Sequence, residues 1–126
     1  MSVTKLDHVN IRTANLERMI AFYEDVVGLR NGDRPPFPIP GAWLYCGAQA
    51  VVHLVSVDRE TVAGADVSLE HFAFGAVDLQ AFLANLESRG IQPRMARLPE
   101  WGHWQVNIFD PDGNHLHVDF APEEQP

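Results

Sequence analysis

The chain has a single cysteine among its 126 residues. One thiol cannot form an internal disulfide, and without a Cys-x-x-Cys pair there is no thiolate set to hold zinc or to carry out redox chemistry. A bound metal ion would therefore be held by nitrogen and oxygen. Long apolar runs are also missing: none approaches the roughly 20 residues of a membrane span, and the first residues lack a signal peptide's apolar core. These absences predict a cytoplasmic protein that does not enter a membrane.

Positive charge is scarce as well. Nine Lys and Arg residues stand against 17 Asp and Glu residues, which gives a net charge of −8. Proteins that follow a nucleic-acid backbone need a concentrated basic surface, so nucleic acid is not expected as a partner. With 46% apolar residues, a chain of 126 residues can bury one core but is too short for two ordinary domains. We expect one domain spanning residues 1–126.

An internal repeat is the most informative feature of the sequence. When the chain is shifted by 63 positions, "HVNIRTANLERMIAFYEDVVGLR" (8–30) aligns with "HFAFGAVDLQAFLANLESRGIQP" (71–93) without a gap. This alignment pairs His8 with His71. A repeat of this length predicts two copies of one supersecondary unit.

Each copy contains the same series of element signals. It opens with an alternating segment typical of a strand, residues 6–11 or 69–74, and continues with apolar residues at helical spacing. Asn15 and Asp78 stand where a helix N-cap is expected. Strand-like runs follow, "AWLYCG" and "AVVHLVSV" in the first copy and "HWQVNIFD" and "HLHVDF" in the second. The order is therefore βαβββ, twice.

Two such copies predict an α+β fold. Module 1–57 and module 68–122 are expected to be joined by the polar linker 58–67. A sheet this small cannot bury its own face. We therefore expect two curved mixed sheets that face a shared cleft, lined by inward-pointing residues of both modules.

Four of the six histidines follow the repeat. His53 and His117 lie in the last strand of each copy, 45 and 46 residues after His8 and His71. One histidine in a half-buried strand is more often a hydrogen-bonded structural residue than a ligand. Four that obey the same internal symmetry favour a common site. His103 and His115 fall outside the symmetry and are expected to be exposed, and Glu70 is expected to point away from His71.

The chain resembles the vicinal oxygen chelate superfamily, which includes glyoxalase I, extradiol dioxygenases and bleomycin-resistance proteins. The resemblance covers nearly the whole chain and rests on "LDHVNIRTANLERMIAFYEDVVGL", "EHFAFGAVDLQAFLANLESRGI" and "FDPDGNHLHVDF". It implies paired βαβββ modules and a divalent ion in the cleft, held by first-strand and last-strand residues of each module. Position by position, the implied ligands are His8, His53, His71 and His117. The ion could be Fe, Ni, Zn, Co or Mn, because ligand type alone does not separate them.

The sequence departs from the family pattern in the last strands. The family usually has glutamate where this chain has His117, and often glutamate or glutamine where it has His53. Asp119 lies two residues beyond His117 on the same strand face. It could be a further ligand, a group that orients His117, or the ligand itself if the register is shifted by two. The shifted register would give His8, His71 and Asp119, a set that non-haem Fe(II) oxygenases use.

The departure bears on the reaction that the resemblance implies. Proton transfer between carbons, as in glyoxalase I, needs a base beside the metal, which here would be His53, His117 or Asp119. Oxygen activation needs no strong base, so a dioxygenase acting on a small bidentate substrate is favoured, with His117, Asp119 and Tyr45 as catalytic candidates. An isomerase, a lyase or a resistance transferase of the same fold is the alternative.

Aromatic residues provide candidates for a substrate pocket. Trp43 and Tyr45 alternate on one strand, and Trp101 and Trp104 are expected to precede the equivalent strand of the second module. Aromatic residues at strand spacing are more often part of the core than ligand contacts. They also keep open a metal-free function of the bleomycin-resistance type, in which an acidic, aromatic groove binds a cationic drug. The resemblance further implies a homodimer, with the cleft either within one chain or between two.

Overall fold

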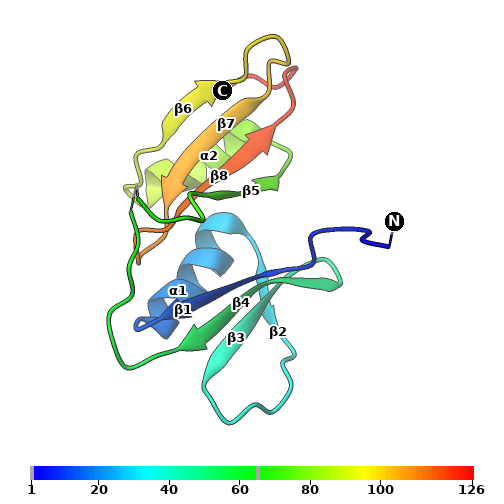
Figure 1. Cartoon of the computed structure of the whole chain (residues 1–126). Coiled ribbons are helices and arrows are strands. Elements are labelled where there is room, and N and C mark those ends of the chain that lie inside the picture. Colours follow the sequence, from blue (N-terminus) through cyan, green and yellow to red (C-terminus); the bar gives the residue numbers. More distant parts are fainter. Residues whose placement is uncertain (1, 65) are drawn as a thin grey trace. The chain divides into compact units, whose positions relative to one another are not determined.

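The computed structural model describes residues 2–64 and 66–126. It divides into two units, Met1–Thr61 and Val62–Pro126. Each unit has one four-stranded mixed sheet and the order βαβββ, so the predicted α+β fold of two repeated modules is confirmed (Figure 1). The predicted cleft depends on how the two units are placed relative to one another, and it stays a prediction.

Unit 1 forms its sheet in the order β1-β4-β3-β2, with β1 parallel to β4 and the other pairs antiparallel. Figure 1 shows α1 lying against this sheet, and α1 contacts β3 and β4. The elements are β1 (Val9–Thr13), α1 (Leu16–Phe22), η1 (Tyr23–Val27), β2 (Arg30–Gly32), β3 (Gly41–Cys46) and β4 (Gln49–Ser56).

Unit 2 repeats this arrangement. Its sheet has the order β5-β8-β7-β6, with β5 parallel to β8. The ring of Phe82 on the helix of this unit lies 5.5 Å from the ring of Phe120 on its last strand, centroid to centroid. The elements are β5 (Phe72–Gly75), α2 (Leu79–Ser88), β6 (Arg94–Arg97), β7 (Trp104–Phe109) and β8 (His115–Phe120).

The first helix changes its winding in the middle. Met19 and Phe22 are buried on α1, and Tyr23 and Val26 continue the same face on the π-helical segment η1. A π-helical turn adds a residue to the i→i−4 pattern without moving the buried face away from the sheet. The chain then leaves through Gly28, whose φ of 92° is the left-handed conformation that glycine adopts without strain. Apolar spacing predicts a helix here but not its change to π winding.

The two helix starts differ. Asp78 caps α2 because its side chain accepts a hydrogen bond from the backbone N–H of Ala81, at 3.1 Å. Asn15 stands at the same place before α1 but makes no side-chain cap bond. There the backbone N–H of Asn15 donates instead to Oγ1 of Thr13, at 2.9 Å. The side-chain cap expected at both helices is therefore confirmed only at α2.

Both first strands begin three residues later than the sequence predicts, at Val9 and Phe72. Leu6 and Leu69, which continue the alternating pattern, are 79% and 66% exposed. Before β1, the backbone carbonyl of Asp7 accepts a hydrogen bond from the side-chain amide of Gln49. The side chain of Gln49 thus donates to the Asp7 carbonyl, which in a longer strand would accept a backbone hydrogen bond of the sheet ladder. The later start leaves the first histidine of each unit just outside its strand.

Each sheet has one face that is apolar and buried. In unit 1, Leu44, Val52 and Leu54 are fully buried on β3 and β4. Trp43 and His53 alternate with these residues, and they are register partners across the two strands. The histidines of interest therefore lie on the face opposite the apolar core. The equivalent core residues of unit 2 are Val106, Ile108, Leu116, Val118 and Phe120.

Candidate functional site

The two histidines of unit 1 lie side by side. His53 on β4 pairs with Asn10 on β1, and His8 stands two residues before Asn10, directly before the strand. The rings of His8 and His53 stack with centroids 3.8 Å apart and planes 9° apart. The internal repeat therefore brings together the first-strand and last-strand histidines of this unit.

His53 is enclosed between two rings. Trp43 stacks on His53 at 4.1 Å and 13°, so the imidazole has Trp43 and His8 as ring neighbours. The Nε2 atom of His53 lies 3.1 Å from the carbonyl oxygen of Ala50. Burial, followed by repulsion from His8, lowers the pKa of His53 from its usual value. A neutral ring that donates Nε2–H to Ala50 keeps its lone pair on Nδ1.

Parallel stacking limits what this pair can chelate. The lone pair of an imidazole lies in its ring plane, and two nearly parallel planes cannot aim their lone pairs at one ion about 2.1 Å from each nitrogen. One of the two rings would have to turn about its side-chain bonds. His8 is the freer ring, since its side chain is 39% exposed and its ring nitrogen Nδ1 lies 2.8 Å from Oδ1 of Asp7, its one hydrogen-bond partner among the described residues. That hydrogen bond lowers the pKa of the Asp7 carboxyl.

The equivalent histidines of unit 2 are also neighbours. His71 precedes β5, and His117 on β8 pairs with Ala73. Their ring centroids are 4.8 Å apart and their planes 44° apart. Nδ1 of His117 lies 2.5 Å from Oδ1 of Asp119, and the His117 side chain is only 8% exposed. This contact fixes the orientation of His117 and leaves its Nε2 as the atom available to a ligand.

A third histidine joins this cluster. His115 lies 5.1 Å from His71, centroid to centroid, and its side chain is 16% exposed. The prediction that His115 is exposed was wrong, because it stands two residues before His117 and shares its strand face.

The prediction for Glu70, that it points away from His71, was also wrong. Its carboxylate turns back toward both rings, so that Oε2 lies 2.6 Å from Nδ1 of His71 and 3.0 Å from Nδ1 of His115. The contacts with His115 and His71 lower the pKa of Glu70.

The polar face of the unit 2 sheet continues onto β7. Asn107 pairs with His117 in register, and its Oδ1 lies 2.7 Å from Nε2 of His115. The amide nitrogen of Asn107 donates to the carbonyl oxygen of Arg94, at 3.1 Å. Asn107 is 5% exposed. Sequence reasoning missed this residue, although its alternation with Val106 and Ile108 could have placed it on the histidine face.

The four aromatic residues predicted to line a substrate pocket lie in different surroundings. Trp43 contacts His53 as described, but the hydroxyl of Tyr45 donates to the backbone carbonyl of Asp33, at 2.6 Å. Trp104 lies on the opposite face of β7 from Asn107, because its register partner is Phe120, whose ring contacts α2. Trp101 is 72% exposed and lies outside the strands. Only Trp43 of these four lies against a candidate histidine.

The second histidine outside the repeat, His103, is half-buried where exposure was expected. It lies in the turn before β7, and the backbone N–H of Leu98 donates to its carbonyl oxygen, at 2.9 Å. The ring nitrogen Nδ1 of His103 is itself buried. The prediction of exposure was therefore wrong for His103 as well.

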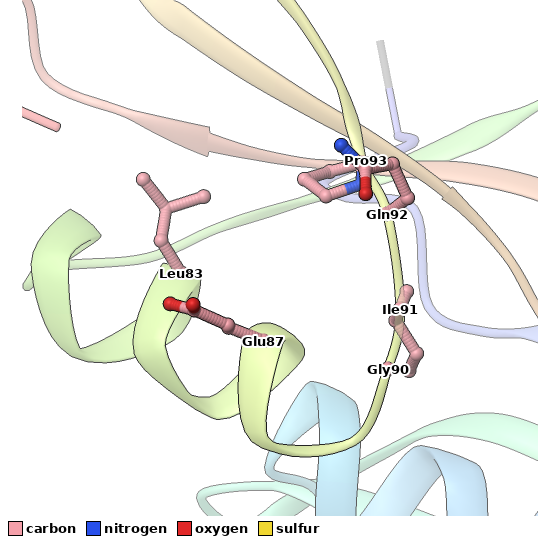
Figure 2. Close-up of a pocket in the computed structure, with 6 residues that line it drawn as sticks. All are labelled: Leu83, Glu87, Gly90, Ile91, Gln92 and Pro93. Carbon is pink, nitrogen blue, oxygen red and sulfur yellow. The ribbon is translucent and has the colours of Figure 1, made fainter.

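A cavity of about 350 Å³ lies elsewhere in unit 2, between α2 and the segment that enters β6 (Figure 2). Its lining contains one ionisable side chain, Glu87, and no histidine. This composition offers no metal-ligand set and no acid–base pair. The lining residues are Leu83, Glu87, Gly90, Ile91, Gln92 and Pro93.

The chemistry of the donor set fits a divalent transition metal. Imidazole nitrogen is a common ligand of zinc, iron, nickel and cobalt, and ligating histidines usually hold their other ring nitrogen to a carboxylate or carbonyl. His8, His71 and His117 each have Nδ1 against a carboxylate. In each of these the remaining nitrogen is Nε2.

Residues 5–118 match the model of the Glyoxalase/Bleomycin resistance protein/Dioxygenase superfamily. The chain therefore belongs to this superfamily, as the resemblance seen in the sequence predicted. No curated protein gives a significant match. Among the helices that the structure describes, none is long and apolar enough to cross a bilayer.

Solved structures share the fold. Lactoylglutathione lyase from Agrobacterium tumefaciens is 25% identical, with a TM-score of 0.71 and coverage of 94% of both chains. A glyoxalase family protein from Enterococcus faecalis is 24% identical, with a TM-score of 0.73 over 94% of this chain and 99% of the other. An antibiotic binding protein from a Streptomyces species is 20% identical, with a TM-score of 0.69 over 96% and 98%. The fold thus occurs in both a lyase and a binding protein.

Proposed function

We propose that this protein is a metal-dependent enzyme that binds a small substrate through two oxygen atoms on a divalent ion. The proposed ligands are His8, His53, His71 and His117. The observation that carries the proposal is the pair in unit 2, where the rings of His71 and His117 are 4.8 Å apart. The Nδ1 atoms of both rings lie against carboxylates.

The surrounding residues have distinct roles in this proposal. Asp119 accepts the Nδ1–H of His117, which sets the tautomer and turns Nε2 toward the site. This contact favours an orienting role for Asp119 over the register in which Asp119 replaces His117 as ligand. When bound, the ion would act as a Lewis acid that polarises a chelating oxygen of the substrate. With neutral imidazoles as ligands, the full ionic charge would favour an anionic substrate.

The state of the carboxylates favours a dioxygenase over an isomerase or lyase. Moving a proton between carbon atoms needs a base whose pKa lies near the working pH. The contacts of Glu70 with His115 and His71 lower its pKa and make it a weaker base. Asp119 is engaged by His117. Oxygen activation does not need a strong base from the protein, because the substrate supplies the electrons.

A row of rings in unit 1 favours drug binding as a second candidate. The ring centroids of Phe37 and Trp43 are 6.4 Å apart, and Trp43, His53 and His8 follow at 4.1 and 3.8 Å. Flat cationic molecules bind well to such faces. The acidic net charge of −8 also favours a cationic ligand. In this second function the protein would bind its ligand without a metal and without turnover.

The two functions make opposite predictions for purified protein without a histidine tag. The enzyme should bind about one Fe²⁺, Ni²⁺ or Zn²⁺ per chain. The Fe²⁺-loaded form should consume oxygen with a panel of catechols in an oxygen electrode, and His117→Ala should abolish this. A lyase would instead form lactoylglutathione with the Zn²⁺ or Ni²⁺ form. The drug-binding function predicts no metal uptake but quenching of tryptophan fluorescence by bleomycin.

We also propose a homodimer, which light scattering would detect at twice the mass of 14.1 kDa.

A further inference from the structure

A second set of ligand-type side chains lies entirely within unit 2. Glu70, His71 and His115 each offer one donor atom, and these atoms all lie within 4.8 Å of one another. Oε2 of Glu70 is 2.6 Å from Nδ1 of His71 and 3.0 Å from Nδ1 of His115. Two imidazoles and one carboxylate form a set that holds divalent metals in many enzymes and leaves open positions.

Asn107 determines which ring nitrogen of His115 carries a proton. The amide nitrogen of Asn107 donates to the carbonyl of Arg94, so the atom that faces His115 is the oxygen Oδ1. An amide oxygen can only accept, and Nε2 of His115 must therefore be protonated. In the neutral ring, the lone pair then lies on Nδ1 and points toward Glu70. A buried amide thus orients His115 as outer groups orient metal ligands.

The contact between His115 and Glu70 is then a meeting of two acceptors. A lone pair on Nδ1 and a carboxylate oxygen 3.0 Å apart repel each other unless a cation lies between them. A proton would make an imidazolium–carboxylate pair. A divalent ion would satisfy both atoms, and Nδ1 of His71 as well. Metal binding distinguishes a bridging proton from a bridging divalent ion.

We propose that Nδ1 of His71, Nδ1 of His115 and Oε2 of Glu70 form a self-contained site for a divalent transition metal such as Zn²⁺ or Co²⁺. This site uses no residue of unit 1. It also uses Nδ1 of His71, whereas Nε2 is the His71 atom left for the site of the proposed function. The two sites therefore share one residue but can be tested separately.

The exposure of the three side chains fits a site with one fixed and two adjustable ligands. Metal bonds of 2.0–2.2 Å place donor atoms about 3 to 3.5 Å apart. His115 is held by Asn107 and its side chain is 16% exposed. His71 and Glu70 have side chains that are 42% and 58% exposed. His115 anchors the ion, and the other two close upon it.

The test is binding of Co²⁺ and Zn²⁺ to the full chain in a His117→Ala background, which removes a ligand of the proposed function. We expect this variant to bind one Co²⁺ per chain, seen as visible absorption bands. Adding Glu70→Gln or His115→Ala should weaken binding at least about 100-fold, and adding Asn107→Leu about 10-fold, the range known for outer groups. Glu87→Gln, an exposed glutamate on α2, is the matched control and should change nothing.

A nitrogen-15 spectrum of the Zn²⁺-loaded His117→Ala protein identifies the bound atoms. We expect the metal-induced shifts on Nδ1 of His71 and His115. The proposal is overturned if the folded His117→Ala variant takes up no Co²⁺, which leaves a proton as the bridging cation, or if Glu70→Gln does not weaken its binding. A failure of the proposed function looks different. In that case the wild-type affinity is insensitive to His8→Ala and His117→Ala, while Glu70→Gln still reduces it.

Discussion

The imidazole rings of His8 and His53 lie 3.8 Å apart in almost parallel planes. The two residues are 45 positions apart in the sequence and meet because β1 pairs with β4 in parallel. Trp43 stacks on His53 as well, at 4.1 Å. This arrangement stabilises an uncharged His53, since a proton would place a charge in a largely buried ring beside a second imidazole.

The stack predicts a loss of stability in acid. Because burial lowers the pKa of His53 from 6.5, the unfolded chain binds this proton more readily than the folded protein does. The contribution of His53 to the free energy of unfolding is complete above pH 6.5 and is lost as the pH falls below that value. Between pH 7.5 and 5.5, metal-free wild-type protein should therefore lose more stability than His53→Gln, as measured by urea denaturation.

An NMR titration provides the control for that prediction. The ring signals of His53 in the metal-free folded protein should have a midpoint below 6.5. A midpoint at or above 6.5, or equal losses of stability in wild-type protein and His53→Gln, would show that burial does not hold this ring neutral.

Two glycines in strands predict opposite effects of added bulk. A Cβ atom at Gly41, the first residue of β3, would lie 2.2 Å from the carbonyl oxygen of Leu54. At Gly75, the last residue of β5, it would meet nothing within 4 Å. Gly41→Ala should lower the free energy of unfolding by about 1–3 kcal/mol or more, the usual cost of overpacking. Gly75→Ala should leave it within about 0.5 kcal/mol. Equal effects in thermal unfolding would contradict the close approach of β3 and β4.

The cap of α2 gives a third prediction. Asp78 has a φ of 69°, in the left-handed region, and its side chain accepts from the N–H of Ala81. Asp78→Ala removes the acceptor and places alanine in an unfavourable backbone conformation, which should cost about 1–2 kcal/mol in chemical denaturation. Asp78→Asn keeps an acceptor and tolerates this conformation, so it should cost no more than about 0.5 kcal/mol. If the two variants were equally stable, the cap would not contribute.

The repeat made the fold predictable from the sequence. The 63-residue shift and the strand and helix periods gave the order βαβββ in both units, because burial of one face imposes these periods. The strand starts were misplaced for a physical reason. Leu6 and Leu69 fit the alternation, but both are exposed, so periodicity alone extended the strands too far.

The site was less predictable because it depends on local contacts. The pairs His8 with His53 and His71 with His117 follow from parallel strand pairing, which the repeat implies. The turning of Glu70 toward His115 depends on side-chain rotation just before β5, where no strand parity applies. The role of Asn107 depends on the register between β7 and β8. Neither periodicity nor spacing contains that information.

Titration of the metal-free, untagged protein with Zn²⁺ or Ni²⁺ in a calorimeter tests the central claim most directly, through two variants of neighbouring residues. The titration uses a His115→Ala background, which removes the second proposed site. If His117 is a ligand and Asp119 only orients it, adding His117→Ala should lower the affinity by at least about 100-fold, while adding Asp119→Asn should lower it by about 10-fold or less. The reverse order, with Asp119→Asn losing the ion and His117→Ala keeping it, would contradict this assignment of the ligands.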